Sequence, residues 1–195
     1  SAGLTFEVRP GEGAFYGPKL EFHLTDSRAR SWQCGTIQLD FVLPERLDAT
    51  FVNADNEHVR PVMIHHVVLG SMERFIAMLL EHDDGWLPVW LAPDQVALAT
   101  VSDASRAYGQ RIMNLFDDAG LRAVFDDRPE RLERKVVDAR EQRIPLFVTV
   151  GPRDEAAQTL SVRLRDGTQQ TWPMIEGVGR VREMARTPYR ARRDR

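Results

Sequence analysis

The sequence predicts an α/β protein of two domains: an α+β region with an antiparallel sheet over residues 1–88, then a βαβαβ domain with a mixed sheet over residues 89–187. In the first region apolar and polar residues alternate, which is typical of strands. In the second, short apolar runs alternate with helical patterns, which indicates mainly parallel strands. Two tryptophans and two prolines within residues 86–93 indicate a short, packed connector between them.

The first region switches from strand spacing to helix spacing once. Apolar side chains occupy every second position from Leu20 to Leu24, so this segment is expected to be a half-buried strand. Phe75, Met78 and Leu79 follow the i, i+3, i+4 spacing of a helix. The expected order is a strand at 20–24, a strand at 36–41, a turn at 53–57, a strand at 61–69 and a helix that begins near Ser71.

The second region carries clear start and stop signals. Asp103 is expected to cap a helix that ends at Gly120. Asp166-Gly167 is a strong hairpin turn signal. The expected strands lie at 96–101, 121–125, 145–150, 160–164 and 168–172; the other expected helices lie at 129–142, with Leu132, Val136 and Val137 facing inward, and from near Glu176. The arginine-rich end, residues 188–195, is expected to be a disordered basic tail.

The composition is that of a globular protein. Hydrophobic residues make up 43% and charged residues 28% of the chain. No apolar run approaches the length that spans a bilayer, and the first residues lack the pattern of a signal peptide. The single cysteine, Cys34, excludes an internal disulfide framework. These features predict a cytoplasmic protein without a membrane partner.

Charge is distributed unevenly along the chain. Residues 1–88 contain seven basic and 13 acidic side chains, whereas residues 89–195 contain 19 basic and 16 acidic ones. A polyanion is therefore expected to prefer the second half. The signal is weak, because seven arginines from Arg180 to Arg195 supply the whole basic excess.

Two local patterns could carry chemistry. Gly70 to Arg74 joins a strand to a helix, and a helix N-terminus followed by an arginine suits a phosphate group. Most such junctions merely begin a helix. His65 and His66 are adjacent on a strand and point to opposite faces, so both cannot serve one site. Neither has a metal-binding neighbour at the usual spacing, and a buried, hydrogen-bonded histidine is the commoner role.

Three segments decide between these readings: Gly11-Glu12-Gly13-Ala14-Phe15-Tyr16-Gly17-Pro18-Lys19, Trp32-Gln33-Cys34-Gly35-Thr36-Ile37-Gln38-Leu39-Asp40-Phe41, and Met63-Ile64-His65-His66-Val67-Val68-Leu69-Gly70-Ser71-Met72-Glu73-Arg74. In order and spacing they resemble the C-terminal part of the threonyl-tRNA synthetase family of class II. The resemblance implies that Gln33, Ser71 and Arg74 contact ATP with its Mg²⁺. It also implies a threonine pocket lined by Tyr16, Lys19, Cys34 and Gln38.

The same resemblance implies a zinc ion. The family holds zinc with one cysteine and two histidines; His65 matches the last, and the other two would precede residue 1. Zinc bound to the amine and hydroxyl of threonine would reject valine, which an apolar pocket discriminates poorly. His66 departs from the arginine usual in the family.

The second domain resembles the anticodon-binding domain of class II synthetases. The resemblance implies that Arg128, Glu130, Arg163 and Arg165 bind the anticodon, and arginine and glutamate can read the edges of unstacked bases. Glu133, Asp166 and residues 151–154 depart from the family pattern.

The resulting hypothesis is a threonine–tRNA ligase, present here as its C-terminal half. Its implied partners are ATP, L-threonine and tRNA(Thr), and DNA is not expected as a partner. The intact enzyme is expected to be a homodimer, and the 195-residue chain alone is expected to be inactive. Two alternatives stay open: a non-catalytic tRNA-binding or regulatory paralogue, and a duplicate synthetase that resists an inhibitor. An open reading frame that continues upstream into the missing motifs would favour a fragment of the enzyme.

Overall fold

The protein divides into two compact units, residues 1–82 and 83–195. The structure is a computed structural model that describes residues 5–188. The boundary falls before the predicted one at residues 88 and 89, so the tryptophan-rich connector groups with the second unit. Residues 189–195 of the predicted basic tail lie outside the described residues. No helix among residues 5–188 is long and apolar enough to cross a membrane.

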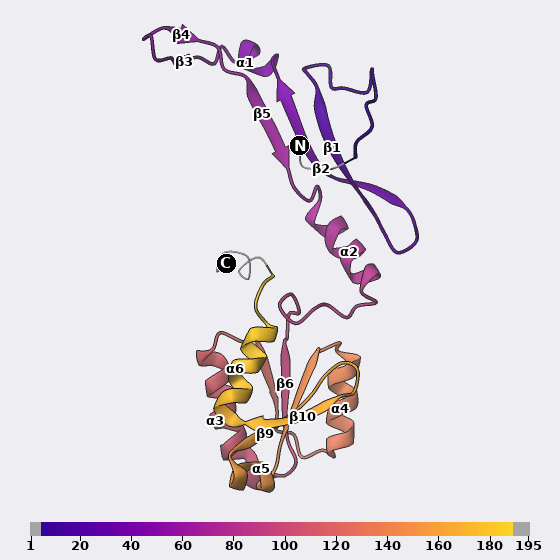
Figure 1. Ribbon diagram of the computed structural model, residues 1–195, viewed down its shortest axis with the longest axis vertical. Helices are drawn as coiled ribbons and strands as arrows, with labels where there is room; N and C mark the ends of the chain where they lie inside the picture. The colour runs from indigo at the N-terminus through magenta and orange to yellow at the C-terminus, as the bar shows by residue number, and fades with distance from the viewer. Residues whose placement is uncertain (1–4, 189–195) are drawn as a thin grey trace. The chain divides into compact units, whose positions relative to one another are not determined.

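The first unit is built on a three-stranded antiparallel sheet (Figure 1). Its strand order is β1-β2-β5, formed by β1 (Lys19–Thr25), β2 (Ser31–Asp40) and β5 (Met63–Val67). A short hairpin, β3 (Phe51–Val52) with β4 (His58–Val59), surrounds the predicted turn, and α2 (Met72–His82) follows β5. The predicted strands and helix are confirmed; the one-turn helix α1 (Leu43–Arg46) was not predicted.

The sheet of the first unit has one polar and one apolar face. Gln38 pairs with Lys19 and His65, whereas Ile37 pairs with Leu20 and His66. The two histidines therefore leave β5 on opposite faces, as predicted. The expectation of a half-buried β1 is wrong for this unit, because Leu20 is 61% exposed. Alternation identifies the apolar face of a strand, but it says nothing of what covers that face.

The second unit contains a five-stranded mixed sheet in the order β10-β9-β8-β6-β7. Three neighbouring strands of this sheet are parallel: β8 (Leu146–Val150), β6 (Val96–Thr100) and the edge strand β7 (Ala123–Asp126). The hairpin of β9 (Thr159–Arg163) and β10 (Gln169–Pro173) is added antiparallel to β8. The predicted βαβαβ unit with a mixed sheet is confirmed.

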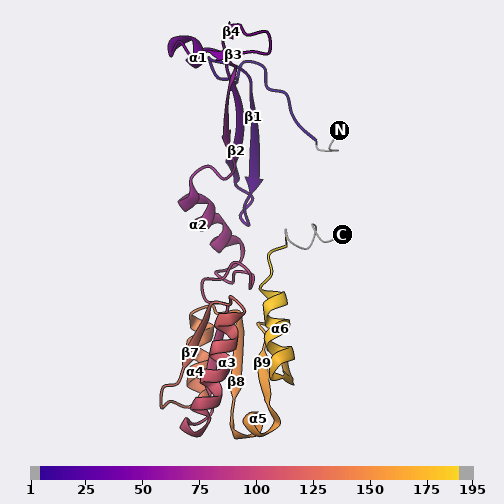
Figure 2. The same cartoon turned by 90° about the vertical axis from the view of Figure 1, so that its left-hand side faces the viewer.

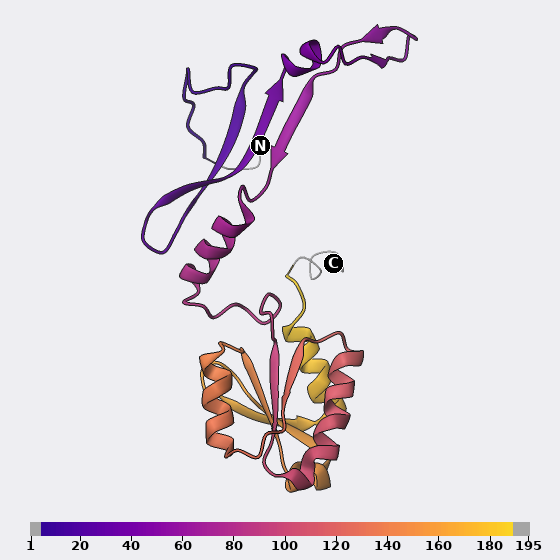
Figure 3. The same cartoon turned by 180° about the vertical axis from the view of Figure 1, so that it is seen from behind.

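Helices cover both faces of this sheet (Figures 1 and 3). Under α3 (Arg106–Asp118) and α6 (Met174–Met184) lies the larger core, in which Leu98, Ile112, Phe116, Leu160 and Val181 are fully buried. Under α4 (Leu132–Glu141) lies a smaller core around Ala97, Ala99 and Phe147. Figure 2 shows α5 (Pro152–Ala157) between β8 and β9. Two separate cores make this unit a complete domain.

Several helix predictions need correction. Asp103 is not a cap; it opens a 3₁₀ turn, Asp103–Ser105, that precedes α3. Val137 is 43% exposed, and Lys135 is buried on the inner side of α4 instead. Its Nζ donates to the backbone oxygens of Thr100 and Asp126 at 3.1 Å each, so hydrogen bonds satisfy a charge that apolar periodicity would place outside. α4 begins later and α6 earlier than predicted, and α5 was not predicted.

Candidate functional site

The glycine-rich segment before β1 positions an aromatic side chain beside β2. The backbone N–H of Phe41 donates to the oxygen of Tyr16 at 3.0 Å, and that of Leu39 donates to the oxygen of Pro18 at 3.1 Å. A Cβ at Gly17 would collide with the carbonyl oxygen of Leu39. Glycine is therefore required where this segment crosses the end of β2, and the crossing fixes Tyr16 over the polar face of the sheet.

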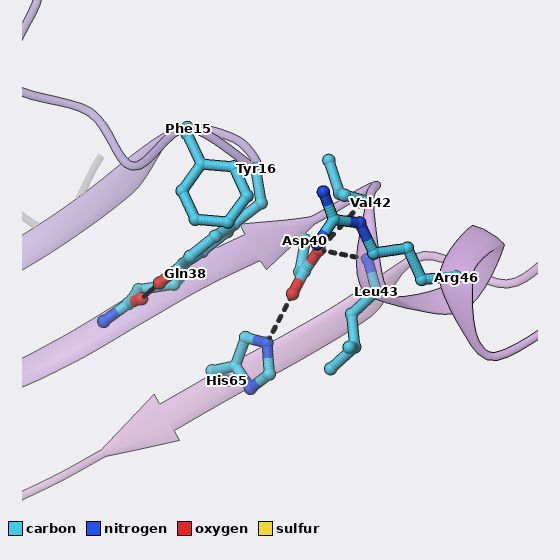
Figure 4. A pocket seen from close by; sticks show the side chains of 8 residues that line it. All are labelled: Phe15, Tyr16, Gln38, Asp40, Val42, Leu43, Arg46 and His65. Atoms are coloured by element: carbon cyan, nitrogen blue, oxygen red, sulfur yellow. Dashed lines mark hydrogen bonds and ion pairs between the residues drawn. The ribbon is translucent and has the colours of Figure 1, made fainter.

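A cavity of about 420 Å³ lies at this end of the sheet (Figure 4). The Tyr16 hydroxyl donates to Oε1 of Gln38, and Nε2 of Gln38 donates to Thr36 Oγ1 at 3.1 Å. The ring of Tyr16 meets the ring of His65 edge-on, with centroids 5.9 Å apart. The lining residues are Phe15, Tyr16, Gln38, Asp40, Val42, Leu43, Arg46 and His65. A few fixed polar groups within apolar walls suit a small polar ligand.

Asp40 is a site residue that the sequence analysis missed. It is buried, and its Oδ2 lies 2.9 Å from Nε2 of His65. Its Oδ1 accepts the backbone N–H groups of Val42 and Leu43, each at 2.9 Å. Burial raises the pKa of Asp40, but hydrogen bonds from these three residues outweigh burial and lower the pKa below its ordinary value. Its position two residues after Gln38, on the same strand face, was the available signal.

The predicted ATP-binding residues meet where β2 approaches α2. Nη2 of Arg74 donates to the backbone oxygen of Gln33 at 2.6 Å, and the Arg74 N–H donates to Ser71 Oγ at 3.3 Å. Gly70 has φ +71°, and a Cβ there would lie 2.9 Å from Arg74 Nη2. The guanidinium carbon of Arg74 also lies 5.9 Å from the ring centroid of Trp32. An exposed arginine is thus held in a defined place beside a helix N-terminus.

Two predicted pocket residues do not line the cavity. Lys19 is the register partner of Gln38, but its Nζ pairs with Glu21 Oε1 at 2.6 Å. The same oxygen of Glu21 accepts Nε2 of Gln33 at 2.9 Å, and the Lys19 hydrogen bond is the main cause of the lowered pKa of Glu21. Cys34 is buried beside the junction at Gly70. Of the four predicted pocket residues, Tyr16 and Gln38 line the cavity.

One residue of the described chain fits a zinc site. Residues 5–188 contain no group of three or more histidine, cysteine, aspartate or glutamate side chains that could hold a metal. His65 has one ring nitrogen engaged by a carboxylate and is partly exposed at the cavity, the arrangement common for zinc-binding histidines. It could supply one ligand, with the others coming from outside the described residues.

The predicted anticodon residues of the second unit have different surroundings. Arg128 pairs with Asp126 at 2.6 Å and with Asp138 at 2.7 Å, and these hydrogen bonds raise the pKa of Arg128. The guanidinium carbon of Arg165 lies 5.2 Å from the ring centroid of Trp86. Arg163 makes one long hydrogen bond of 3.3 Å, to Gln169, and Glu130 is exposed. Arg163 and Glu130 are therefore the more available of the four.

Comparison with known proteins agrees with this geometry. Residues 4–83 match the family described as tRNA synthetase class II core domain (G, H, P, S and T), and residues 95–184 match the family described as anticodon binding domain. The chain belongs to the class II tRNA synthetases. A class II core thus carries the cavity, and the anticodon-binding domain is the five-stranded unit.

Among the class II synthetases, the individual relatives below are all named for threonine. The chain is 49% identical over 166 residues to the threonine–tRNA ligase of Desulfatibacillum aliphaticivorans, covering 85% of this chain and 26% of that protein. It is 44% identical over 188 residues to the threonine–tRNA ligase of Burkholderia orbicola (strain MC0-3), covering 96% and 30%. The RNA binding domain of threonyl-tRNA synthetase from Cryptosporidium parvum Iowa II superposes with a TM-score of 0.83 at 31% identity, covering 90% of this chain and 45% of that one. The chain therefore spans only 26–30% of the length of these curated relatives.

Proposed function

We propose that this chain is part of a threonine–tRNA ligase, which joins L-threonine to tRNA(Thr) at the expense of ATP. The observation that carries the proposal is the cavity at Tyr16, Gln38 and His65 within a class II core. The high identity to proteins named threonine–tRNA ligase supports the choice of amino acid. The enzyme is proposed to act in the cytoplasm as a homodimer.

Each step of the proposed reaction has residues on the polar side of the first unit. His65 would help hold a zinc ion, and zinc, when bound, supplies ligand sites for the amine and hydroxyl of threonine. Gln38, held by Tyr16, would orient the amino acid beside it. Arg74, Gln33 and Ser71 would bind ATP with its Mg²⁺, because the guanidinium group of Arg74 and the N-terminus of α2 both favour phosphate. Binding and charge stabilisation would drive the reaction without a protein nucleophile.

The five-stranded unit is proposed to select the tRNA. Arg163 and Glu130 are exposed enough to reach bases of the anticodon loop. Arg128 and Arg165 are proposed to act chiefly by shaping the domain, since two carboxylates hold the first and Trp86 stacks on the second.

The proposal is tested with a chimaera in which this chain replaces the matching stretch of the Desulfatibacillum aliphaticivorans ligase. We expect threonine-dependent exchange of pyrophosphate into ATP by the chimaera, and none by the 195-residue chain. Exchange by the chain alone would show that its own residues complete the site. A folded, zinc-loaded chimaera without exchange would favour a non-catalytic tRNA-binding role. Exchange that persists in the presence of an inhibitor of the parent ligase would favour a resistant duplicate.

A further inference from the structure

We propose that Asp40 is a positioning residue: it fixes His65 in the tautomer protonated at Nε2, so that Nδ1 presents its lone pair to the metal ion. The inference rests on the proposed function only in identifying the ligand as zinc. The tautomer and its cause follow from the hydrogen bonds of the first unit.

The Asp40 carboxylate is immobilised before it meets His65. It is 3% exposed, and both of its oxygens are used. The N–H groups of Val42 and Leu43 donate to Oδ1, and Nε2 of His65 lies 2.9 Å from Oδ2. Rotation of the carboxylate would break two backbone hydrogen bonds at the start of α1. Oδ2 is thus aimed at the imidazole by the chain turn that leaves β2.

An ionised carboxylate only accepts hydrogen bonds. The proton between Asp40 and His65 must therefore come from Nε2 of the ring, and the neutral imidazole then carries its lone pair on Nδ1. Among the described residues, Nδ1 of His65 has no hydrogen-bond partner. Figure 4 shows the ring held at one nitrogen by Asp40, with the other nitrogen on the side of the ring away from Asp40, and His65 lines the cavity together with Tyr16 and Gln38.

The geometry makes Asp40→Asn an informative substitution. The amide oxygen would take the place of Oδ1 and keep the N–H groups of Val42 and Leu43. The amide NH₂ would then donate toward Nε2 of His65. Nε2 can accept this hydrogen bond only if it carries a lone pair instead of a proton. The ring would move its proton to Nδ1, and the nitrogen available to a metal would be lost although the pocket keeps its shape.

The test is ¹⁵N NMR of the full chain with labelled histidine at pH 8, where an ordinary imidazole is neutral. The His65 signals are assigned by their loss in His65→Gln. We expect Nε2–H in the unsubstituted chain and in Asp48→Asn, a control at an exposed carboxylate that pairs with Arg60. We expect Nδ1–H in Asp40→Asn. On titration with zinc ion, the Nδ1 signal should move, and Asp40→Asn should require about 10–100-fold more zinc for the same change.

Three results would overturn the inference. The unsubstituted chain could show Nδ1–H, or a doubly protonated ring at pH 8. Asp40→Asn could leave both the tautomer and the zinc response of His65 unchanged. The first two need only the assignment variant His65→Gln beside the unsubstituted chain, so an Asp40→Asn protein that fails to fold leaves the test intact. Inactivity of the chimaera, by contrast, would count against the proposed function and not against the role of Asp40.

Discussion

His65 and His66 are neighbours in sequence but lie on opposite faces of the sheet. Their partners on β2 are Gln38 and Ile37, so one ring joins the polar face and the other joins the apolar face. In the chimaera, His65→Ala is expected to lose bound zinc and threonine activation, whereas His66→Ala keeps the zinc. Metal analysis of the two purified variants is the measurement. Equal zinc loss in both would mean that the face assignment is wrong.

Asp26 ties the loop after β1 to the start of β2. Its side chain accepts Nε1 of Trp32 at 2.8 Å, Nε of Arg30 at 2.6 Å, and the backbone N–H groups of Arg28 and Arg30. Burial raises the pKa of Asp26, but these hydrogen bonds lower it well below the usual value. Because the folded-state pKa is depressed, the stabilisation is complete above the unfolded-state pKa of about 3.9 and is lost as pH falls toward the folded-state value.

Asp26→Asn is therefore expected to lower the urea midpoint of the first unit at pH 7, and by less at pH 3. Unfolding is followed by tryptophan fluorescence, and the contribution of Trp32 is obtained by subtracting the signal of the Trp32→Phe variant. The quantity compared at each pH is the gap in urea midpoint between the unsubstituted chain and Asp26→Asn. A gap that stays constant from pH 7 to pH 3 would show that ionised Asp26 does not stabilise the loop.

For single residues, the sequence predicted which residues belong to a site better than it predicted the contacts that they make. Gln33, Ser71 and Arg74 were expected together and do meet, because β2, which carries Gln33, pairs with β5 next to the junction of β5 and α2. The stacking of Arg165 on Trp86 could not be predicted, since it depends on how the connector packs against a hairpin far along the chain. Asp40 was overlooked because its role depends on a turn that has no periodic pattern.

Among the elements, the segment before β1 has the tightest fit. Gly17→Ala would push Cβ against the carbonyl oxygen of Leu39 and move Tyr16 off Gln38. Gly13→Ala is the matched control, because the nearest atom to its Cβ would lie at 3.5 Å, an ordinary contact. In the chimaera we expect Gly17→Ala to raise KM for threonine at least several-fold with zinc content unchanged, and Gly13→Ala to change neither. Identical kinetics for the two variants would contradict the proposed crossing.

The β9–β10 hairpin offers a second matched pair. Arg163→Ala is expected to cost about 1–3 kcal/mol of binding to the cognate anticodon stem-loop and less on a scrambled loop, because it removes the proposed base contact. Arg165→Ala removes the contact with Trp86, so it should lower the unfolding midpoint and affect both loops alike. Binding of the full chain is measured by fluorescence anisotropy at fixed salt. Equal losses on both loops for Arg163→Ala would make that residue a backbone contact.

Long elements were predictable and short ones were not. The strands and the helices α2, α3, α4 and α6 have at least one clear period or a strong turn signal such as Asp166-Gly167. The one-turn helix α1 and the six-residue α5 are too short to show a period. Helix ends shifted because caps depend on contacts: Asp103 opens a 3₁₀ turn instead of capping α3.

In the whole molecule, the two units differ in how fully each buries its apolar side chains. The five-stranded unit encloses two cores of its own, whereas the three-stranded sheet leaves apolar side chains such as Leu20 and Ile64 exposed. The sequence predicted the two kinds of sheet but not this difference, because burial depends on neighbours that alternation does not specify. We propose that the first unit selects the amino acid and that the second selects the tRNA.

Threonylation of tRNA(Thr) by the chimaera tests that account most directly, because it requires both units in one reaction. The chimaera is assayed with tRNA(Thr) and with a tRNA(Thr) whose anticodon is changed, each with threonine and with valine. We predict transfer of threonine to tRNA(Thr), with kcat/KM at least 100-fold higher than for valine or for the changed anticodon. A folded chimaera that binds tRNA(Thr) and zinc yet transfers no threonine would contradict the account.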